Sequence, residues 1–209
     1  MHISDGVLPT YVTVGGYVIS ATLVAWSARK TRSQDLPKLA VVTAAFFVAS
    51  LIHIPLGPTS AHLLIPGLTG ALLGPPAFLS IGLGLLLQSL LFQFGGLTAL
   101  GANTLMMGLP AVICGWIFQR FKGQKRMRQV IVGGLVGALG TAMAALFLAS
   151  LLVTGGEDFL GVAKIALLAH IPVIIIEGTV SAFTIGFLAR VKPDLLRAAF
   201  MPASKGTNA

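Results

Sequence analysis

The first two residues, Met1 and His2, carry three nitrogen atoms that could bind one metal ion together. They are the free α-amine of Met1, the backbone amide nitrogen of His2 and the nearer ring nitrogen of His2. Binding all three closes a five-membered and a six-membered chelate ring that share the amide nitrogen. Displacing an amide proton needs a strongly polarising late first-row ion, and coplanar nitrogens suit square-planar geometry. The pattern therefore points to Ni(II) or Cu(II), with Co(II) as a further candidate. A flexible terminus that begins Met-His by accident is the alternative.

A second histidine-bearing stretch runs from His53 to His62 and contains several Pro and Gly residues. The Pro and Gly residues predict a stiff turn, and Ser60 can cap a helix that follows it. His62 is then expected in the first turn of an apolar helix, where it could supply the fourth nitrogen of a planar set. A buried polar residue satisfied by its own neighbours is the alternative. His53 is expected at the membrane interface, as a snorkelling side chain or as an axial ligand.

The glycine-rich segment 94–103 is expected to form a loop on the same face as the chelating terminus. A ligating imidazole commonly donates its second N–H to an amide or carboxylate oxygen. Asp5, Ser60 and Asn103 are the candidates for this orienting role. The alternative for Asn103 is that it satisfies the backbone groups of the loop itself.

His170 and Glu177 lie seven residues apart in one apolar stretch, so they share a face of the predicted helix. Ionisable residues inside a membrane generally mark function. A proton relay and a bundle-interior pair both fit, so the roles of these two residues and of His53 stay open.

The composition predicts an integral membrane protein. Of 209 residues, 56% are hydrophobic and 10% are charged, against about a quarter charged in soluble domains. The mean hydropathy is +0.92. Long apolar stretches favour helices over the alternating pattern of a membrane β-barrel. These stretches fall at 9–28, 37–54, 61–74, 76–94, 102–120, 129–154 and 161–190.

The positive charge follows a topological pattern. Basic residues cluster after the first stretch, between 120 and 128, and from Arg190 onward. Positive loops stay in the cytoplasm. Only seven crossings, including the short stretch 61–74 or something equivalent, place all three clusters inside. The net charge of +8 is therefore read as topology rather than as a nucleic-acid surface.

The expected fold class is all-α: a polytopic integral membrane helical bundle of about seven transmembrane helices, with the N-terminus outside and the C-terminus cytoplasmic. One membrane domain is expected over 1–209. It comprises a chelating segment at 1–8, the bundle at 9–190 and a cytoplasmic tail at 191–209.

Small residues four apart, which allow close helix packing in lipid, occur at Ala21 and Ala25 and at Gly133 and Gly137. The chain contains neither a G-x-x-x-x-G-K-[ST] phosphate loop nor an H-E-x-x-H zinc motif. A metal site without an energy source indicates a binding subunit that draws on another protein.

Five segments resemble the CbiM/NikM family, the metal-binding membrane subunits (S components) of energy-coupling-factor transporters for nickel and cobalt. These segments are M-H-I-x-D-G at 1–6, P-L-G-P-T-S-A-H-L-L at 55–64, G-A-L-L-G-P-P-A-F at 70–78, L-L-L-Q-S-L-L-F at 85–92 and F-G-G-L-T-A-L-G-A-N-T-L at 94–105.

The resemblance implies that Met1, His2 and His62 bind the ion. It also implies partners: a transmembrane coupling subunit, ABC-type ATPase subunits and often a small accessory membrane subunit. Ala21 and Ala25 resemble the face that meets the coupling subunit. The expected protein is a capture subunit in a bacterial or archaeal cell membrane, without an ATPase of its own, with Ni(II) slightly favoured over Co(II) as the transported substrate.

Three alternatives remain open: a cobalt-specific subunit that supplies cobalamin synthesis, an autonomous metal permease, and a structural or signalling membrane subunit with an incidental chelate.

Overall fold

The computed structural model describes residues 2–56, 59–156 and 159–197, with backbone alone for 54–56 and 59–61. Within these ranges the chain forms seven α-helices and one small sheet, which confirms the all-α class. The helices are α1 Thr10–Lys30, α2 Leu36–Ala49, α3 Pro66–Leu73, α4 Ala77–Phe92, α5 Leu100–Phe121, α6 Arg126–Thr154 and α7 Phe159–Val191. The strands are β1 His2–Ile3, β2 His53–Leu56 and β3 Thr59–His62, and two 3-10 turns are η1 Ser33–Asp35 and η2 Pro193–Leu196.

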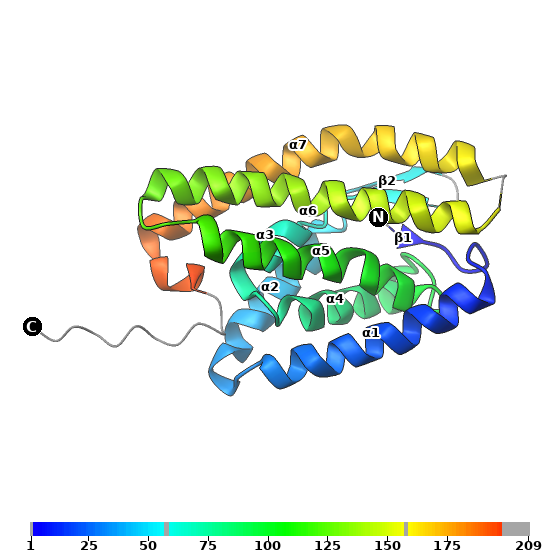
Figure 1. Cartoon of the computed structure of the whole chain (residues 1–209), viewed down its shortest axis with the longest axis horizontal. Helices are drawn as coiled ribbons and strands as arrows, with labels where there is room; N and C mark the ends of the chain where they lie inside the picture. Colours follow the sequence, from blue (N-terminus) through cyan, green and yellow to red (C-terminus); the bar gives the residue numbers. More distant parts are fainter. Residues whose placement is uncertain (1, 57–58, 157–158, 198–209) are drawn as a thin grey trace, which may run out of the picture.

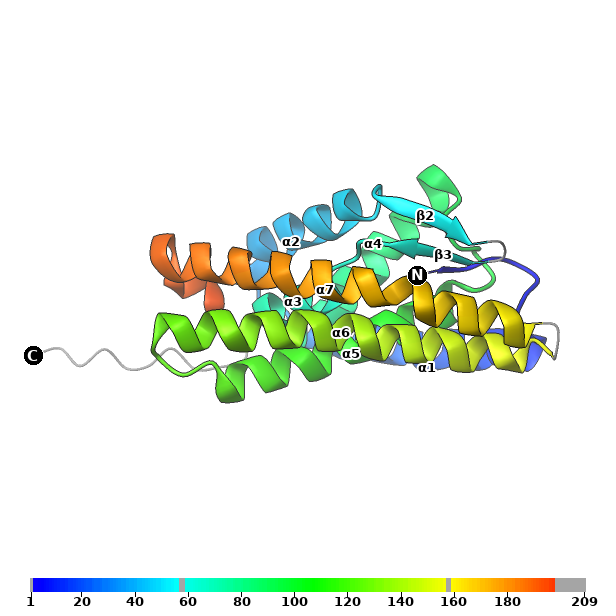
Figure 2. The ribbon, with the colours of Figure 1, turned by 90° about the horizontal axis from the view of Figure 1, so that it is seen from above.

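The chain is a multi-pass membrane protein. In the described part of the chain, the four helices α1, α5, α6 and α7 are long and apolar enough to cross a membrane. Figure 1 shows that the end of α1, the α5–α6 connection and the end of α7 lie at one end of the bundle. The three basic clusters therefore share that end, which the positive-inside rule assigns to the cytoplasm. The small sheet lies toward the opposite end (Figures 1 and 2).

The stretch 61–74, for which the sequence allows a short tilted helix or a re-entrant segment buried in protein, is helical only in its second part. Residues 59–62 form strand β3, and α3 begins only at Pro66 and ends at Leu73. An eight-residue helix is about 12 Å long and cannot cross the hydrocarbon core alone. All eight residues of α3 are buried, so protein rather than lipid surrounds it.

The hairpin of β2 and β3 explains why no helix forms earlier. The two strands pair antiparallel, with His53 opposite His62, and β1 pairs with the other edge of β3. Ser60 therefore lies within a strand and does not cap a helix, and His62 ends a strand instead of beginning a helix. Similarly, α2 ends at Ala49, so His53 lies in β2 rather than at the end of a membrane span.

Helices α6 and α7 lie side by side along most of their length (Figures 1 and 2). A Cβ atom at Gly133 would lie 2.5 Å from Ile185 Cδ1, and one at Gly137 would lie 2.3 Å from Ser181 Oγ. The glycine pair that the sequence shows on this helix therefore packs within the chain.

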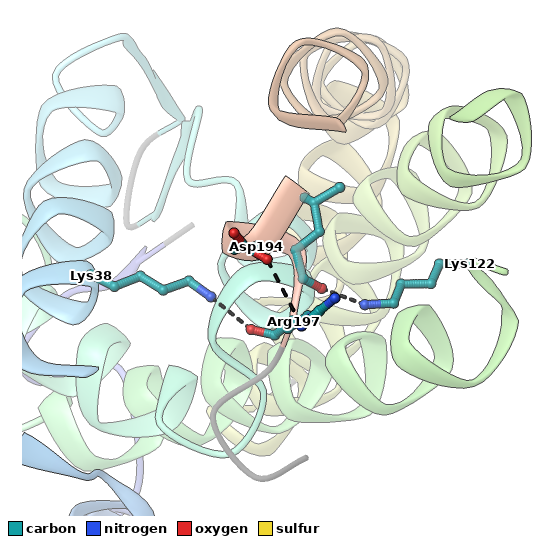
Figure 3. A network of polar contacts seen from close by, with 5 residues as sticks. Lys38, Lys122, Asp194 and Arg197 are labelled. Atoms are coloured by element: carbon teal, nitrogen blue, oxygen red, sulfur yellow. Dashed lines mark hydrogen bonds and ion pairs between the residues drawn. The ribbon is translucent and has the colours of Figure 1, made fainter. Parts of the chain in front are cut away.

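The last described residues are hydrogen-bonded to side chains from α2 and from the end of α5 (Figure 3). Lys38 Nζ donates to the Arg197 carbonyl at 3.0 Å, and Lys122 Nζ donates to the Leu196 carbonyl at 2.5 Å. The side chain of Leu196 is buried. The Arg197–Asp194 ion pair is exposed and adds little to stability. The first residues of the segment expected as a tail are therefore docked on the helices.

Gln119 joins this docked segment to α3, and its replacement should weaken the fold. Its Nε2 donates to the Ala71 carbonyl at 3.2 Å and to the Leu196 carbonyl at 3.0 Å. Gln119 Oε1 also accepts from Lys122 Nζ at 2.7 Å. Gln119→Leu removes all three bonds and should cost about 1–3 kcal/mol of unfolding free energy. Thermal unfolding in detergent measures the loss. Gln129→Leu, at an exposed hydrogen bond, is the matched control, and equal melting of the two variants would contradict the expectation.

Candidate metal centre

The N-terminal segment is laid into the protein as a short strand. In the pairing of β1 with β3, His2 lies opposite Ser60 and Ile3 opposite Thr59. The Ile3 amide donates to Asn103 Oδ1 at 2.9 Å, and Asn103 Nδ2 donates back to the Ile3 carbonyl at 3.1 Å. Asn103 lies in the first turn of α5, not in the expected loop. Its amide fixes the backbone directly after His2.

The connection between α4 and α5 forms hydrogen bonds with the N-terminal segment from Ile3 to Asp5. Asp5 Oδ1 accepts hydrogen bonds from the Thr98 amide, at 2.8 Å, and from the Thr98 hydroxyl. The Gly96 amide donates to the Ile3 carbonyl at 3.3 Å. This close approach needs glycine, because a Cβ at Gly96 would lie 1.7 Å from Asp5 Oδ1. Two segments far apart in the sequence thus hold the chelating end in place.

Gly96→Ala should release the N-terminal strand. The new methyl group cannot share space with the Asp5 carboxylate, so one of the two must move. Hydrogen exchange of the 3–5 amides, followed by mass spectrometry, should become faster than in the parent protein. Gly161→Ala is the matched control, because nothing lies within 4 Å of a Cβ there. Unchanged exchange in Gly96→Ala would show that the glycine is not needed for docking.

The structure brings the imidazoles of His2 and His62 together. Their ring centroids are 4.4 Å apart with an interplanar angle of 79°, and both side chains are buried. His2 Nε2 lies 2.7 Å from Gln88 Oε1, and His62 Nδ1 lies 2.7 Å from the Ser50 carbonyl oxygen. An amide or backbone carbonyl oxygen can only accept a hydrogen bond, so His2 Nε2 and His62 Nδ1 are the protonated nitrogens of their rings.

The hydrogen bonds therefore select the tautomers. With the proton on Nε2, His2 has its lone pair on Nδ1, the ring nitrogen that closes a six-membered ring with the His2 amide. With the proton on Nδ1, His62 has its lone pair on Nε2. Fixing the tautomer through the second nitrogen is the usual way in which proteins prepare imidazoles for metals.

Burial keeps both imidazoles neutral. It lowers the pKa of His62 to about 3 and the pKa of His2 well below its ordinary value, because a charged ring would lose its hydration. A neutral imidazole is the form that binds a metal ion. Both imidazoles of the site are therefore in the metal-binding form at neutral pH.

His53 and Phe94 close the outer side of this pair. The exposed His53 ring stacks on His62 with centroids 5.0 Å apart and an interplanar angle of 16°. Phe94 lies 4.6 Å from His53 and 4.8 Å from His62, measured between ring centroids. His53 thus lies against a candidate ligand and stays open to solvent.

The remaining predicted site residues fall into separate places. Met1 and the side chain of Ser60 lie outside the described residues. Asp5 and Asn103 hold the N-terminal segment, whereas Gln88 and the Ser50 carbonyl bind the imidazoles. Gln88 stands out in the sequence as a polar residue in an apolar helix. A backbone carbonyl such as that of Ser50 leaves no trace in the sequence.

Two further sets of residues lie away from the imidazole pair. Ala21 and Ala25 are exposed on α1, as a contact face for another helix requires. His170 and Glu177 are buried on α7. His170 Nδ1 donates to the Ala166 carbonyl at 2.6 Å, one turn back on the same helix.

Side chains alone do not complete a metal site here. Within residues 2–56, 59–156 and 159–197, no three His, Cys, Asp or Glu side chains converge to hold an ion. His2 and His62 provide two imidazoles, so any further ligand to an ion at this place would come from outside this set of side chains.

Comparison with known proteins identifies related membrane proteins. The family model described as CbiM, a cobalt uptake substrate-specific transmembrane region, matches residues 2–195. A protein from Haemophilus influenzae, named as a metal transport protein, is 36% identical over 94% of this chain and 97% of its own length. A protein from Archaeoglobus fulgidus, named as the fused nickel transport protein NikMN, is 32% identical over 94% of this chain and 68% of its length. A crystal structure of a transition metal transporter is 25% identical with a TM-score of 0.76, over 91% of this chain and 93% of that chain.

Proposed function

Because this chain belongs to the CbiM family of transmembrane metal-uptake proteins, we propose that it is the Ni(II)- or Co(II)-capturing subunit of an energy-coupling-factor transporter. Membership makes it a component of a metal transporter. The finer assignment concerns which ion it binds, with which atoms, and which proteins work with it.

One observation carries the proposal: the buried imidazoles of His2 and His62 meet in tautomers prepared for one metal ion. The lone pair on His2 Nδ1 can join the His2 amide nitrogen and the Met1 amine in two fused chelate rings. The lone pair on His62 Nε2 supplies the fourth nitrogen. We therefore assign Met1, His2 and His62 as the ligands, with the ion held in an approximately square-planar set.

Capture begins when the ion reaches the outer face and displaces one proton from the amine and one from the amide. Gln88 and Ser50 hold the two rings in place during this step, and Asn103, Asp5 and Thr98 hold the strand that carries the amide. These hydrogen bonds would hold the ligands near their binding positions and so reduce the reorganisation that binding requires.

A planar four-nitrogen set favours Ni(II), whose d⁸ configuration gains most from that geometry. Co(II), taken up for cobalamin synthesis, is the close alternative. Cu(II) would bind more tightly still in the general order of stabilities, so the availability of the ions in the cell decides between them.

Release into the cytoplasm is proposed to need partners, because the chain has no phosphate-binding loop. The exposed Ala21 and Ala25 face of α1 is the proposed contact with a transmembrane coupling subunit. ABC-type ATPase subunits would supply the energy, and a small accessory membrane subunit completes the proposed assembly. The rival function, an autonomous permease, predicts metal uptake by cells that express this chain alone.

The test is titration of the purified full chain with Ni(II) and, separately, with Co(II). The proposal expects one ion per chain and the absorption spectrum of planar Ni(II). In parallel, cells expressing the chain alone should accumulate no more metal than cells without it. Weak binding comparable to that of a free Met-His peptide would overturn the capture function, and uptake by the chain alone would favour the permease.

A further inference from the structure

The chain makes a tight bend directly after His62, between β3 and α3. Ile65, at the end of this bend, has a φ of +50°, in the left-handed region of the backbone map. A β-branched residue rarely adopts that conformation, because its side chain crowds the backbone. Such backbone persists where the surrounding structure holds it, often beside a functional site. The bend that follows the candidate ligand therefore needs support from outside.

Two hydrogen bonds provide that support. The Leu63 amide donates to the Ile52 carbonyl at 3.0 Å, which continues the pairing of the hairpin. The Leu64 amide donates to Glu177 Oε1 at 2.7 Å, across 113 residues of sequence. Leu64 and Glu177 are both fully buried, at 0% exposure. Because water does not reach this amide, Glu177 is the partner that satisfies it.

The second oxygen of Glu177 ties the bend to another helix. Thr141 on α6 donates its hydroxyl to Glu177 Oε2, while Glu177 itself belongs to α7. One carboxyl group thus joins the β3–α3 bend to both helices of the α6–α7 pair. Among the described residues, no Lys or Arg pairs with it, so neutral donors hold this carboxyl.

We propose that Glu177 is a positioning residue for the metal site, which fixes the bend that places the His62 ring toward His2. This inference rests on the proposed function, because it assigns Glu177 a role in that same site. Ligands must be held to within about 0.5 Å of their productive positions, and Leu64 follows His62 by only two residues. Loss of the carboxyl would leave the Leu64 amide buried without its acceptor, and the bend would relax.

The proposal also couples the site to the α6–α7 pair. If the bend geometry favours metal binding, then bound metal must favour that geometry to the same extent. Ni(II) should therefore slow hydrogen exchange of the Leu64 amide. Glu177 is thus the residue through which metal binding at the outer site would affect α6 and α7.

Four versions of the full chain test the role: wild type, Glu177→Met, Glu177→Gln and Ser181→Ala. Met has a similar size but no acceptor, so Ni(II) affinity should fall by about 10–100-fold and the planar spectrum should weaken. Gln keeps an acceptor for Leu64 and should restore most of the affinity and the planar spectrum. Ser181 lies one turn further along α7 and is fully buried, and its hydroxyl makes no hydrogen bond with the described residues, so its alanine variant controls for a local packing change.

The outcomes test the proposed function and the role of Glu177 separately. Failure of the wild-type chain to bind Ni(II) overturns the proposed function. Wild-type binding with equal affinity in Glu177→Met overturns the positioning role alone, as does a Gln variant no better than Met. If Glu177→Met does not fold, Thr141→Val decides, because it removes the hydrogen bond from α6 to Glu177 and, besides that, only the bond of the same hydroxyl to the Gly137 carbonyl in its own helix. A several-fold loss of affinity supports the role, and wild-type affinity contradicts it.

Discussion

Replacing His62 with alanine is expected to lower the Ni(II) affinity of the purified protein by at least about 100-fold. Removing a hydrogen-bond partner of a metal ligand typically lowers metal affinity by up to about 100-fold. A ligand should matter more than such a partner. His62 lies at the end of β3, where its Nδ1 donates to the Ser50 carbonyl, and its Nε2 is the proposed fourth nitrogen ligand. With alanine there, water would have to complete the coordination plane, and the planar Ni(II) spectrum should be lost.

His53→Ala is the matched control for this prediction. His53 also carries an imidazole and stacks on His62 with ring centroids 5.0 Å apart, but it is exposed and is not one of the proposed ligands. Its removal should leave the spectrum planar. The rival in which the Met-His terminus is an incidental chelate predicts that His62→Ala binds Ni(II) as wild type does. Titration with a competing chelator measures the Ni(II) affinity of the wild type, His62→Ala and His53→Ala on one scale.

The second large effect is the response to acid. Near neutral pH and below, the ion displaces one proton from the amine and one from the amide, both of which are protonated before binding. The imidazoles contribute none, because burial lowers the pKa of His62 to about 3 and that of His2 well below its ordinary value. Affinity should therefore fall by about 100-fold for each pH unit between pH 7 and pH 5, with two protons released per ion.

A free Met-His peptide provides the comparison. Its imidazole has an ordinary pKa of about 6.5, so below that pH a third proton must be displaced and its affinity should fall more steeply. The slope of log affinity against pH between 5 and 6 should thus be about two for the protein and approach three for the peptide. Equal slopes would show that burial does not keep the two rings neutral in the protein.

The helices of this protein were largely predictable from the sequence, because hydropathy over a long stretch depends on local composition. The stretches 102–120, 129–154 and 161–190 became α5, α6 and α7 with small shifts at their ends. The stretch 61–74 was not predictable in this way. A short apolar run fits a strand or a buried helix equally well, and strand pairing with β1 and β2 depends on residues far away in the sequence.

The candidate metal site was likewise predictable from the sequence only in part. The ligand roles proposed for Met1, His2 and His62 start from residue types, because few combinations of nitrogen donors favour a planar ion. Their hydrogen-bond partners could not, since Gln88 lies 86 residues from His2 and Ser50 acts through its backbone. Asn103 was a candidate for orienting an imidazole, yet the structure uses it to hold the Ile3 backbone.

Glu177 illustrates why a residue's importance is easier to predict than its role. A carboxyl group within a membrane helix is costly unless it is satisfied, so the sequence alone marks the position. Only the fold reveals that its two oxygens meet the Leu64 amide and the Thr141 hydroxyl. The partners come from two other elements, and no spacing along α7 encodes them.

The most direct test of the account is Ni(II) titration of the chain that begins at Met1 beside a version with two extra residues before Met1. The extension keeps every side chain and converts only the terminal amine into an amide. The account predicts tight, stoichiometric binding with a planar spectrum for the first protein and loss of both for the second. Equal binding by the two proteins would contradict it and would move the ligands into the helical bundle.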